Sequence, residues 1–303
     1  MCSEKINNSR SLAEYYQEYY GEEFRDLTFE MSLEDSSIVS IPSHKIEQKL
    51  CYNSQPLPTD LFCDSNDISK KSAKLIVQNL KQIANSKGCS EILLSDKLYE
   101  GNLSTMSAEL FNQEATYELL FNLHIDFQDF TEANFFKGLR KSYKSLVNWG
   151  RKNLVVDVVN AQNYSYDKFM KFKEFHALIS GRQTRSDESW DIQAGLSQNG
   201  GGELILAYLN DELVAGSFFL DEFKRSRYFN GVYQRDLFHL GIAHYPVYMG
   251  IVRSQMRNPH GYCHLGSIMS DNDDNKLKNI EFFKKGFCPR LTPSIVWRLS
   301  CQS

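Results

Sequence analysis

The sequence predicts an α/β protein with two similar halves, because one order of elements occurs twice along it. Helix, glycine, strand, short helix and strand follow one another in residues 68–127 and again in residues 242–300. In the first half, apolar residues at helical spacing predict a helix over residues 68–87, which Gly88 ends. Residues 117–127 alternate apolar and polar side chains, as a strand does. Identity between the halves is negligible, so the order of elements alone indicates the repeat.

The composition is that of an ordinary globular protein. The chain has 303 residues, 42% of them hydrophobic and 24% charged, and this length suffices for two domains. A formal net charge of −4 argues against a general nucleic-acid binder. The seven cysteines include no Cys-x-x-Cys pair, which argues against a zinc site or a disulfide framework. With no signal peptide or membrane-spanning run in the sequence, we expect a cytoplasmic protein without a metal or a membrane partner.

The stretch over residues 228–287 carries the pattern that points to a function. Its predicted elements are, in order, a strand, a helix, a strand and a helix, over residues 228–233, about 241–257, 262–265 and 275–285. Gly241 lies between the first strand and the first helix. A helix start beside the end of a strand presents unpaired N–H groups and the positive end of the helix dipole. Such a place binds phosphate or pyrophosphate.

These residues resemble the acyl-CoA-binding half of a GNAT N-acyltransferase, in the branch related to the Fem peptidoglycan aminoacyltransferases. The pyrophosphate loop of that superfamily reads Gln/Arg-x-x-Gly-x-Gly/Ala. Gly241 and Ala243 fill its last positions, whereas Phe238 departs from the pattern. The ending EFFKKGF at residues 281–287 resembles the Fem-like ending in which Phe-Lys precedes Gly-Phe. Phe282 stands where many GNAT enzymes have the tyrosine that protonates the leaving thiolate.

The resemblance covers residues 203–287 and implies two tandem GNAT-like domains, each with a mixed, mostly antiparallel sheet flanked by helices. The expected parts are a degenerate N-terminal domain, a basic connecting helix and a C-terminal acyl-CoA-binding domain, over residues 1–130, 131–152 and 153–303. Thr131 is the expected N-cap of the connecting helix, and Gly150 is its expected C-terminal stop.

Basic residues provide the candidates for binding the acceptor. Residues 137–152 carry six basic side chains and no acidic one, which predicts either a solvated helix face or an edge that recruits phosphate. Two further arginines follow a helix predicted over residues 166–179, and an aspartate in a loop is suited to an ammonium group. The candidates for substrate binding are Arg140, Lys141, Lys144, Arg182, Arg185 and Asp271.

The resemblance implies that an amine attacks the thioester of an acyl-CoA directly, while the protein holds the pyrophosphate and polarises the carbonyl. Strands that splay near Tyr233 would admit the pantetheine arm. The candidates for catalysis are Tyr228, Asn230, His264 and His239. The candidates for contact with acyl-CoA are Tyr233, Gly241, Ile242, Ala243, His244 and Lys284. For His239 and His244, phosphate contact and proton transfer are equally open.

We therefore expect an N-acyltransferase that moves an acyl group from a CoA thioester to the amine of a small polar acceptor. A nucleotide-linked amino sugar for surface polysaccharide is the leading candidate for that acceptor. One alternative is a Fem-like ligase that moves an amino acid from charged tRNA to a peptidoglycan precursor. The other is a non-catalytic scaffold whose GNAT site has decayed, which Phe238 and Phe282 favour and Gly241 opposes.

Overall fold

The computed structural model describes residues 12–34, 38–59, 68–98, 101–222, 225–268, 274–288 and 290–301. They form two compact units. Unit 1 comprises residues 1–15 and 122–291, and unit 2 comprises residues 16–121 and 292–303. Each unit holds a mixed, mainly antiparallel set of strands with helices packed on it, which confirms the predicted fold class. No helix in these described ranges is long and apolar enough to cross a membrane.

Unit 1 is built on a sheet with the order β8-β13-β12-β11-β10-β9. Its strands, in that order, are Thr116–Asp126, Tyr262–Ile268, Arg225–Tyr233, Glu212–Glu222, Gly202–Leu209 and Val155–Val159. The last residues of β8 belong to this unit, and its first residues belong to unit 2. Strands β9 to β12 pair antiparallel, whereas β12 and β13 pair in parallel. Asn210 and Asp211 form the turn of the β10–β11 hairpin, with both residues at positive φ.

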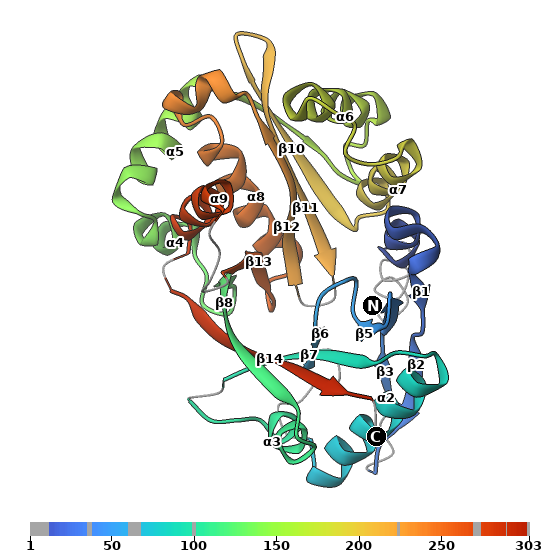
Figure 1. Cartoon of the computed structure of the whole chain (residues 1–303). Helices are drawn as coiled ribbons and strands as arrows, with labels where there is room; N and C mark the ends of the chain where they lie inside the picture. The colour runs from blue at the N-terminus through green and yellow to red at the C-terminus, as the bar shows by residue number, and fades with distance from the viewer. Residues whose placement is uncertain are drawn as a thin grey trace. The chain divides into compact units, whose positions relative to one another are not determined.

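Helices cover both faces of this sheet (Figure 1). On one face lie α4 (Glu132–Gly138), α5 (Lys141–Asn153), α8 (His244–Arg257) and α9 (Asn275–Lys285). On the other face lie α6 (Tyr166–Ser180) and α7 (Asp187–Gln198). The neighbouring residues Phe218 and Phe219 of β11 show the division. Phe219 packs in one core with Ile251 of α8, and the Phe218 ring centroid lies 5.6 Å from that of Phe169 on α6.

The basic helix expected between the domains is two helices of unit 1. Thr131 caps the first as predicted, since its side chain accepts a hydrogen bond from the Asn134 N–H. The chain is extended at Leu139, which is buried, and α5 then begins. The prediction that Gly150 ends the helix is wrong, because α5 continues to Asn153. A Cβ on Gly150 would lie 2.4 Å from the Tyr245 Cβ, so this glycine permits the close approach of α5 to α8.

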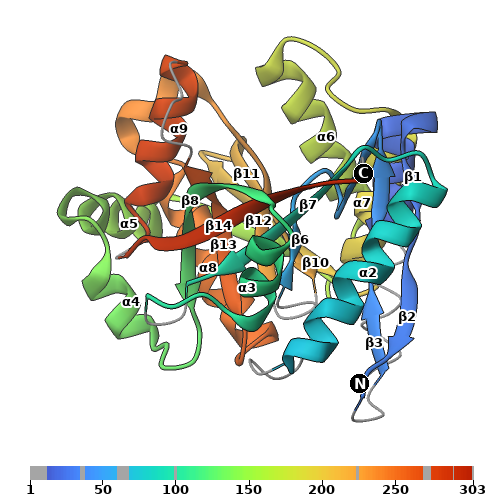
Figure 2. The same ribbon diagram turned by 60° about the horizontal axis from the view of Figure 1, so that its bottom comes forward.

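Unit 2 has a sheet with the order β1-β4-β5-β7-β14-β8, in which β6 also pairs with β7, and a separate hairpin of β2 and β3. Its strands β1 to β7 and β14 are Arg25–Asp26, Phe29–Ser32, Ile38–Ile41, His44–Ile46, Lys49–Cys51, Leu57–Pro58, Glu91–Lys97 and Thr292–Ser300. The helices α2 (Lys70–Ser86) and α3 (Thr105–Asn112) pack on this sheet in one core (Figure 2). The helix predicted over residues 68–87 is thereby confirmed, with Ser69 as its N-cap.

These compact units divide the chain differently from the expected boundaries at residues 130 and 152. Helices α4 and α5 belong to unit 1, where α5 packs on α8. The C-terminal strand β14 belongs to unit 2, where it pairs antiparallel with β7 over seven residues, from Ser294 with Lys97 to Ser300 with Glu91. Pairing between such distant segments leaves no local pattern in the sequence.

Candidate active site

The parallel strands β12 and β13 part soon after they begin. Their register runs from Arg225 opposite Tyr262 to Arg227 opposite His264. Next along β12, the pairing with β11 shifts, because Phe218 pairs with Asn230 and Phe219 with Tyr228. Phe229 is therefore the extra residue of a β-bulge, and a bulge leaves its backbone groups outside the regular ladder. The bulge in β12 therefore lies close to the point where β12 and β13 part.

A glycine turn leads from β12 to helix α8. After a 3₁₀ helix (η3, Arg235–Leu240), Gly241 adopts φ +74°, which favours glycine. The turn is closed by two hydrogen bonds of 3.0 Å, from the Gly241 N–H to the Phe238 carbonyl and from the His244 N–H to the Gly241 carbonyl. A Cβ on Gly241 would lie 2.7 Å from Leu146 of α5. The turn is therefore packed on α5, with Gly241, Ile242 and Ala243 buried.

The two histidines beside this turn have different surroundings. The His244 Nδ1 lies 3.0 Å from the Gly241 carbonyl oxygen, and its ring packs edge-on against Tyr143 at 4.3 Å between centroids. Burial lowers the His244 pKa, so the ring is neutral near neutral pH. His239 is exposed on η3, with Nδ1 3.0 Å from the Asp236 carbonyl oxygen. His244 thus belongs to the packing of the turn, while His239 faces solvent.

Two tyrosines of β12 form a hydroxyl chain on the face that α8 and α9 cover. The Tyr228 and Tyr233 hydroxyls are 2.6 Å apart, and the Tyr233 hydroxyl lies 2.9 Å from the Ser217 Oγ. Gly231 makes room for them, since a Cβ there would lie 1.8 Å from the Tyr228 hydroxyl. Burial raises the pKa of Tyr228 well above its ordinary value and that of Tyr233 to about 12. Both phenols therefore stay protonated near neutral pH and act as hydrogen-bond donors, not as bases.

Asn230 lies on the opposite face of the sheet from Tyr228. Its Oδ1 accepts a 2.6 Å hydrogen bond from Arg185 Nη2, and its Nδ2 donates to Gln193 of α7. Arg185, in the loop between α6 and α7, also donates from Nε to the Tyr15 hydroxyl at 3.0 Å. Every acceptor that this guanidinium contacts among the described residues is neutral. The loop therefore holds an uncompensated positive charge beside the bulged strand.

Helix α7, which supplies Gln193, was not predicted from the sequence. Its start carries ordinary signals: Ser186 accepts a hydrogen bond from the Ser189 N–H, and Asp187 and Glu188 occupy the first turn. Glycine and polar residues on both sides obscured these signals. Trp190, also on α7, stacks 5.2 Å from the Arg185 guanidinium and helps to fix it.

Of the remaining basic candidates, only Arg182 lies in the same loop as Arg185. Arg140 donates from Nη2 to the Phe282 carbonyl at 3.0 Å, and its guanidinium lies 3.9 Å from the Phe282 ring centroid. It therefore holds the end of α9. Lys141 is exposed and Lys144 half-buried on α5, across the sheet from α6 and α7, while Arg182 is exposed. Asp271 lies outside the described residues.

His264 and Lys284 both lie near the place where β12 and β13 part. His264 is opposite Arg227 in the register, and the Lys284 ammonium lies 5.5 Å from the Tyr228 ring centroid. Burial, followed by the charges of Arg225 and Arg227, holds the His264 pKa well below its ordinary value. His264 is therefore neutral and available to accept a proton, but only weakly basic. Within the described ranges, no group of three or more His, Cys, Asp or Glu residues is placed to hold a metal ion.

No protein-family model matches the sequence, and neither does any curated protein. The fold is nevertheless shared with solved structures over most of the chain. The crystal structure of FemX has a TM-score of 0.62 at 10% identity, covering 95% of both chains. L-PGS from Bacillus licheniformis has a TM-score of 0.54 at 12% identity, covering 95% of this chain and 90% of that one. A tandem GNAT protein from the clavulanic acid biosynthesis pathway has a TM-score of 0.50 at 7% identity, covering 89% and 82%.

The chain thus has a tandem GNAT-like fold of the kind seen in FemX. In unit 1 the elements from β12 to α9 are those that the resemblance to the acyl-CoA-binding half of a GNAT enzyme led us to expect.

Proposed function

We propose that the protein is an N-acyltransferase that moves an acyl group from a CoA thioester to the amine of a small polar acceptor. The observation that carries this proposal is the coincidence of three features in unit 1. The parallel strands β12 and β13 part at a bulge, the Gly241 turn follows β12, and the start of α8 follows the turn. Together they offer a slot for a thioester arm and a place for its pyrophosphate.

On this proposal the donor lies between β12 and β13. The backbone of Gly241, Ile242 and Ala243 contacts the pyrophosphate, and backbone groups at the Phe229 bulge polarise the thioester carbonyl. Phe282 cannot protonate the leaving thiolate, and its ring is 62% exposed against Arg140. A thiol has an ordinary pKa of about 8.5, so a strong acid is not needed. Tyr228 provides a protonated hydroxyl that can donate to the thiolate.

The acceptor binds on the other face of β12, beside Asn230 and Arg185. A guanidinium that is fixed by Tyr15 and Asn230 but has no carboxylate partner among the described residues favours an acceptor with a phosphate or carboxylate. A nucleotide-linked amino sugar supplies both the phosphate and the amine. It is therefore the acceptor class that we propose first.

A thiol-release assay with acetyl-CoA and a UDP-linked amino sugar tests this function and its pH dependence. His264 is already neutral and the tyrosines stay protonated from about pH 6 to about pH 9. We therefore expect the rate to rise with pH along a single limb, as the amine of the acceptor loses its proton. An additional rise of the rate near pH 6.5 that disappears in the His264→Gln variant would contradict the conclusion that His264 is already neutral at that pH.

The second candidate is a Fem-like transfer of an amino acid from charged tRNA. One observation favours it: α4 and α5 carry exposed lysines suited to a polyanion, namely Lys137, Lys141 and Lys152. Transfer from charged tRNA without thiol release from acetyl-CoA would support this candidate over the first. Binding of neither donor would indicate a scaffold with a decayed site.

A further inference from the structure

Three nitrogen-bearing side chains converge at the root of the β12–β13 split. Arg227 and His264 are opposite each other in the parallel register. Lys284 extends from α9 to the same strand as His264, with its ammonium 3.0 Å from the position that a Cβ on Gly266 would occupy. Gly266 has φ +120°, so the strand is irregular here and leaves this space to the lysine. The place where the strands part is therefore lined by basic groups.

The carboxylate nearest to this cluster is already shared. Glu222 accepts from Arg227 Nη1 at 3.1 Å and also pairs with Arg225. Lys284 has no hydrogen bond or ion pair with any residue that the structure describes. Burial and then the charge of Arg227 lower the Lys284 pKa, although Cys288 and Glu281 oppose this effect. The ammonium thus lies in a positive field without an acceptor of its own.

His264 has one ring nitrogen without a partner. Its Nε2 faces the Ser267 Oγ at 3.5 Å, whereas its Nδ1 is buried and has no hydrogen-bond partner in the described part of the chain. A buried polar atom without a partner is costly, and the great majority of such atoms in proteins are satisfied. The Nδ1 without a partner, on a ring that the charge of Lys284 reaches, therefore indicates a ligand that the chain itself does not supply.

We infer that Lys284 and His264 form a subsite for an oxyanion, a carboxylate or a phosphate, of a bound substrate. The anion neutralises the Lys284 ammonium and favours protonation of His264, whose Nδ1–H then donates to the anion. Arg227 adds positive potential but stays paired with Glu222. The inference rests on the proposed function only for the identity of the molecule that carries the anion, since binding of a small anion requires no transfer reaction.

The test is a nuclear magnetic resonance titration of the histidine-labelled full chain with sodium phosphate and, separately, sodium acetate. The His264 ring signal is the one that is missing in the His264→Gln variant. We expect it to shift saturably with at least one of the two anions, and its pKa to rise by about one unit. Comparing phosphate with acetate shows which oxyanion the subsite takes.

Three variants and one salt control decide the outcome. In the Lys284→Gln variant, about tenfold more anion should be needed for the same shift of the His264 signal. A tenfold change in affinity is the same free energy as a pKa change of about one unit. Lys276→Gln removes an exposed lysine of α9 and should behave as the unmodified protein. Arg185→Met should leave this signal unaffected, because Arg185 contacts Asn230 and Tyr15 and not His264. An equal shift with sodium chloride, or an unchanged titration in Lys284→Gln, would overturn the inference even if thiol release is observed.

Discussion

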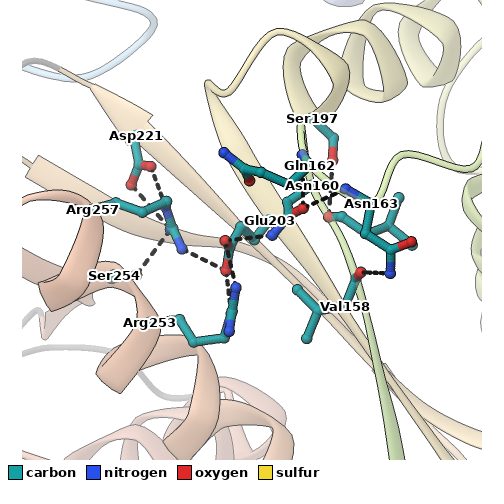
Figure 3. A network of polar contacts seen from close by, with 11 residues as sticks. Val158, Asn160, Gln162, Asn163, Ser197, Glu203, Asp221, Arg253, Ser254 and Arg257 are labelled. Carbon is teal, nitrogen blue, oxygen red and sulfur yellow. Dashed lines mark hydrogen bonds and ion pairs between the residues drawn. The ribbon is translucent and has the colours of Figure 1, made fainter.

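Replacing Arg257 by methionine is expected to lower the free energy of unfolding by about 3–5 kcal/mol, because the change leaves buried carboxylates short of a cation. Arg257 joins α8 to two strands of unit 1 (Figure 3). Its Nε lies 2.6 Å from Asp221 Oδ2 on β11, and its Nη1 lies 2.7 Å from Glu203 Oε2 on β10. The Glu203 side chain is only 5% exposed. Urea unfolding measures the loss.

Arg253→Met provides the matched control on the same helix. Arg253 contacts Glu203 at 2.6 Å, but its side chain is 31% exposed. When Arg253 is replaced, Glu203 keeps Arg257 and Asn160 as partners. We expect a loss of about 1 kcal/mol or less for this partly exposed pair. Equal losses in the two variants would show that the network does not depend on Arg257 more than on Arg253.

Replacing Arg185 by methionine should raise the KM for an anionic acceptor about 10- to 100-fold, the loss expected when a hydrogen bond to a charged group is removed. The effect should fall on KM more than on kcat, because Arg185 binds the anionic group and does not touch the reacting amine. The KM for acetyl-CoA should stay the same, since our proposal places the donor on the other side of the bulge. Steady-state kinetics with each substrate varied in turn separates these effects.

The neighbouring Arg182 provides the control for charge alone. Arg182 is exposed in the same loop, so Arg182→Met removes an equal charge without removing the contact to Asn230. We expect a change of less than about twofold in the acceptor KM, because exposed charges are screened by salt. An effect as large as that of Arg185→Met would show that the loop acts only through its net charge.

Elements with local signals were predictable from the sequence. Helix α9 has the predicted bounds, Asn275–Lys285. The local signals did not fix the buried face of α8, on which Val247 and Ile251 are buried while Met256 is 67% exposed. Helical spacing permits more than one apolar stripe, and the sheet beneath the helix decides which of them is buried.

Features of the site that depend on contacts between distant residues were not predictable. Tyr228 and Asn230 are two residues apart on one strand, and a regular strand would place both side chains on the same face of the sheet. The bulge at Phe229 places them on opposite faces. The partner that fixes Asn230 is Arg185, 45 residues earlier in the chain. No periodicity in either segment reports that contact. By contrast, the glycine turn at Gly241 lies within one local stretch, so its conformation could be foreseen.

The central claim, that the split of β12 and β13 and the Gly241 turn hold a CoA thioester, is tested most directly by calorimetric titration with CoA. We expect binding with a Kd between about 1 μM and about 1 mM. Gly241→Ala should weaken it about tenfold, because φ +74° and contact with Leu146 would force the turn to move. Gly88→Ala, at φ +66° in open space in unit 2, should leave the CoA affinity unchanged. Absence of CoA binding to the folded protein, or equal affinity in the Gly241→Ala variant, would contradict the account.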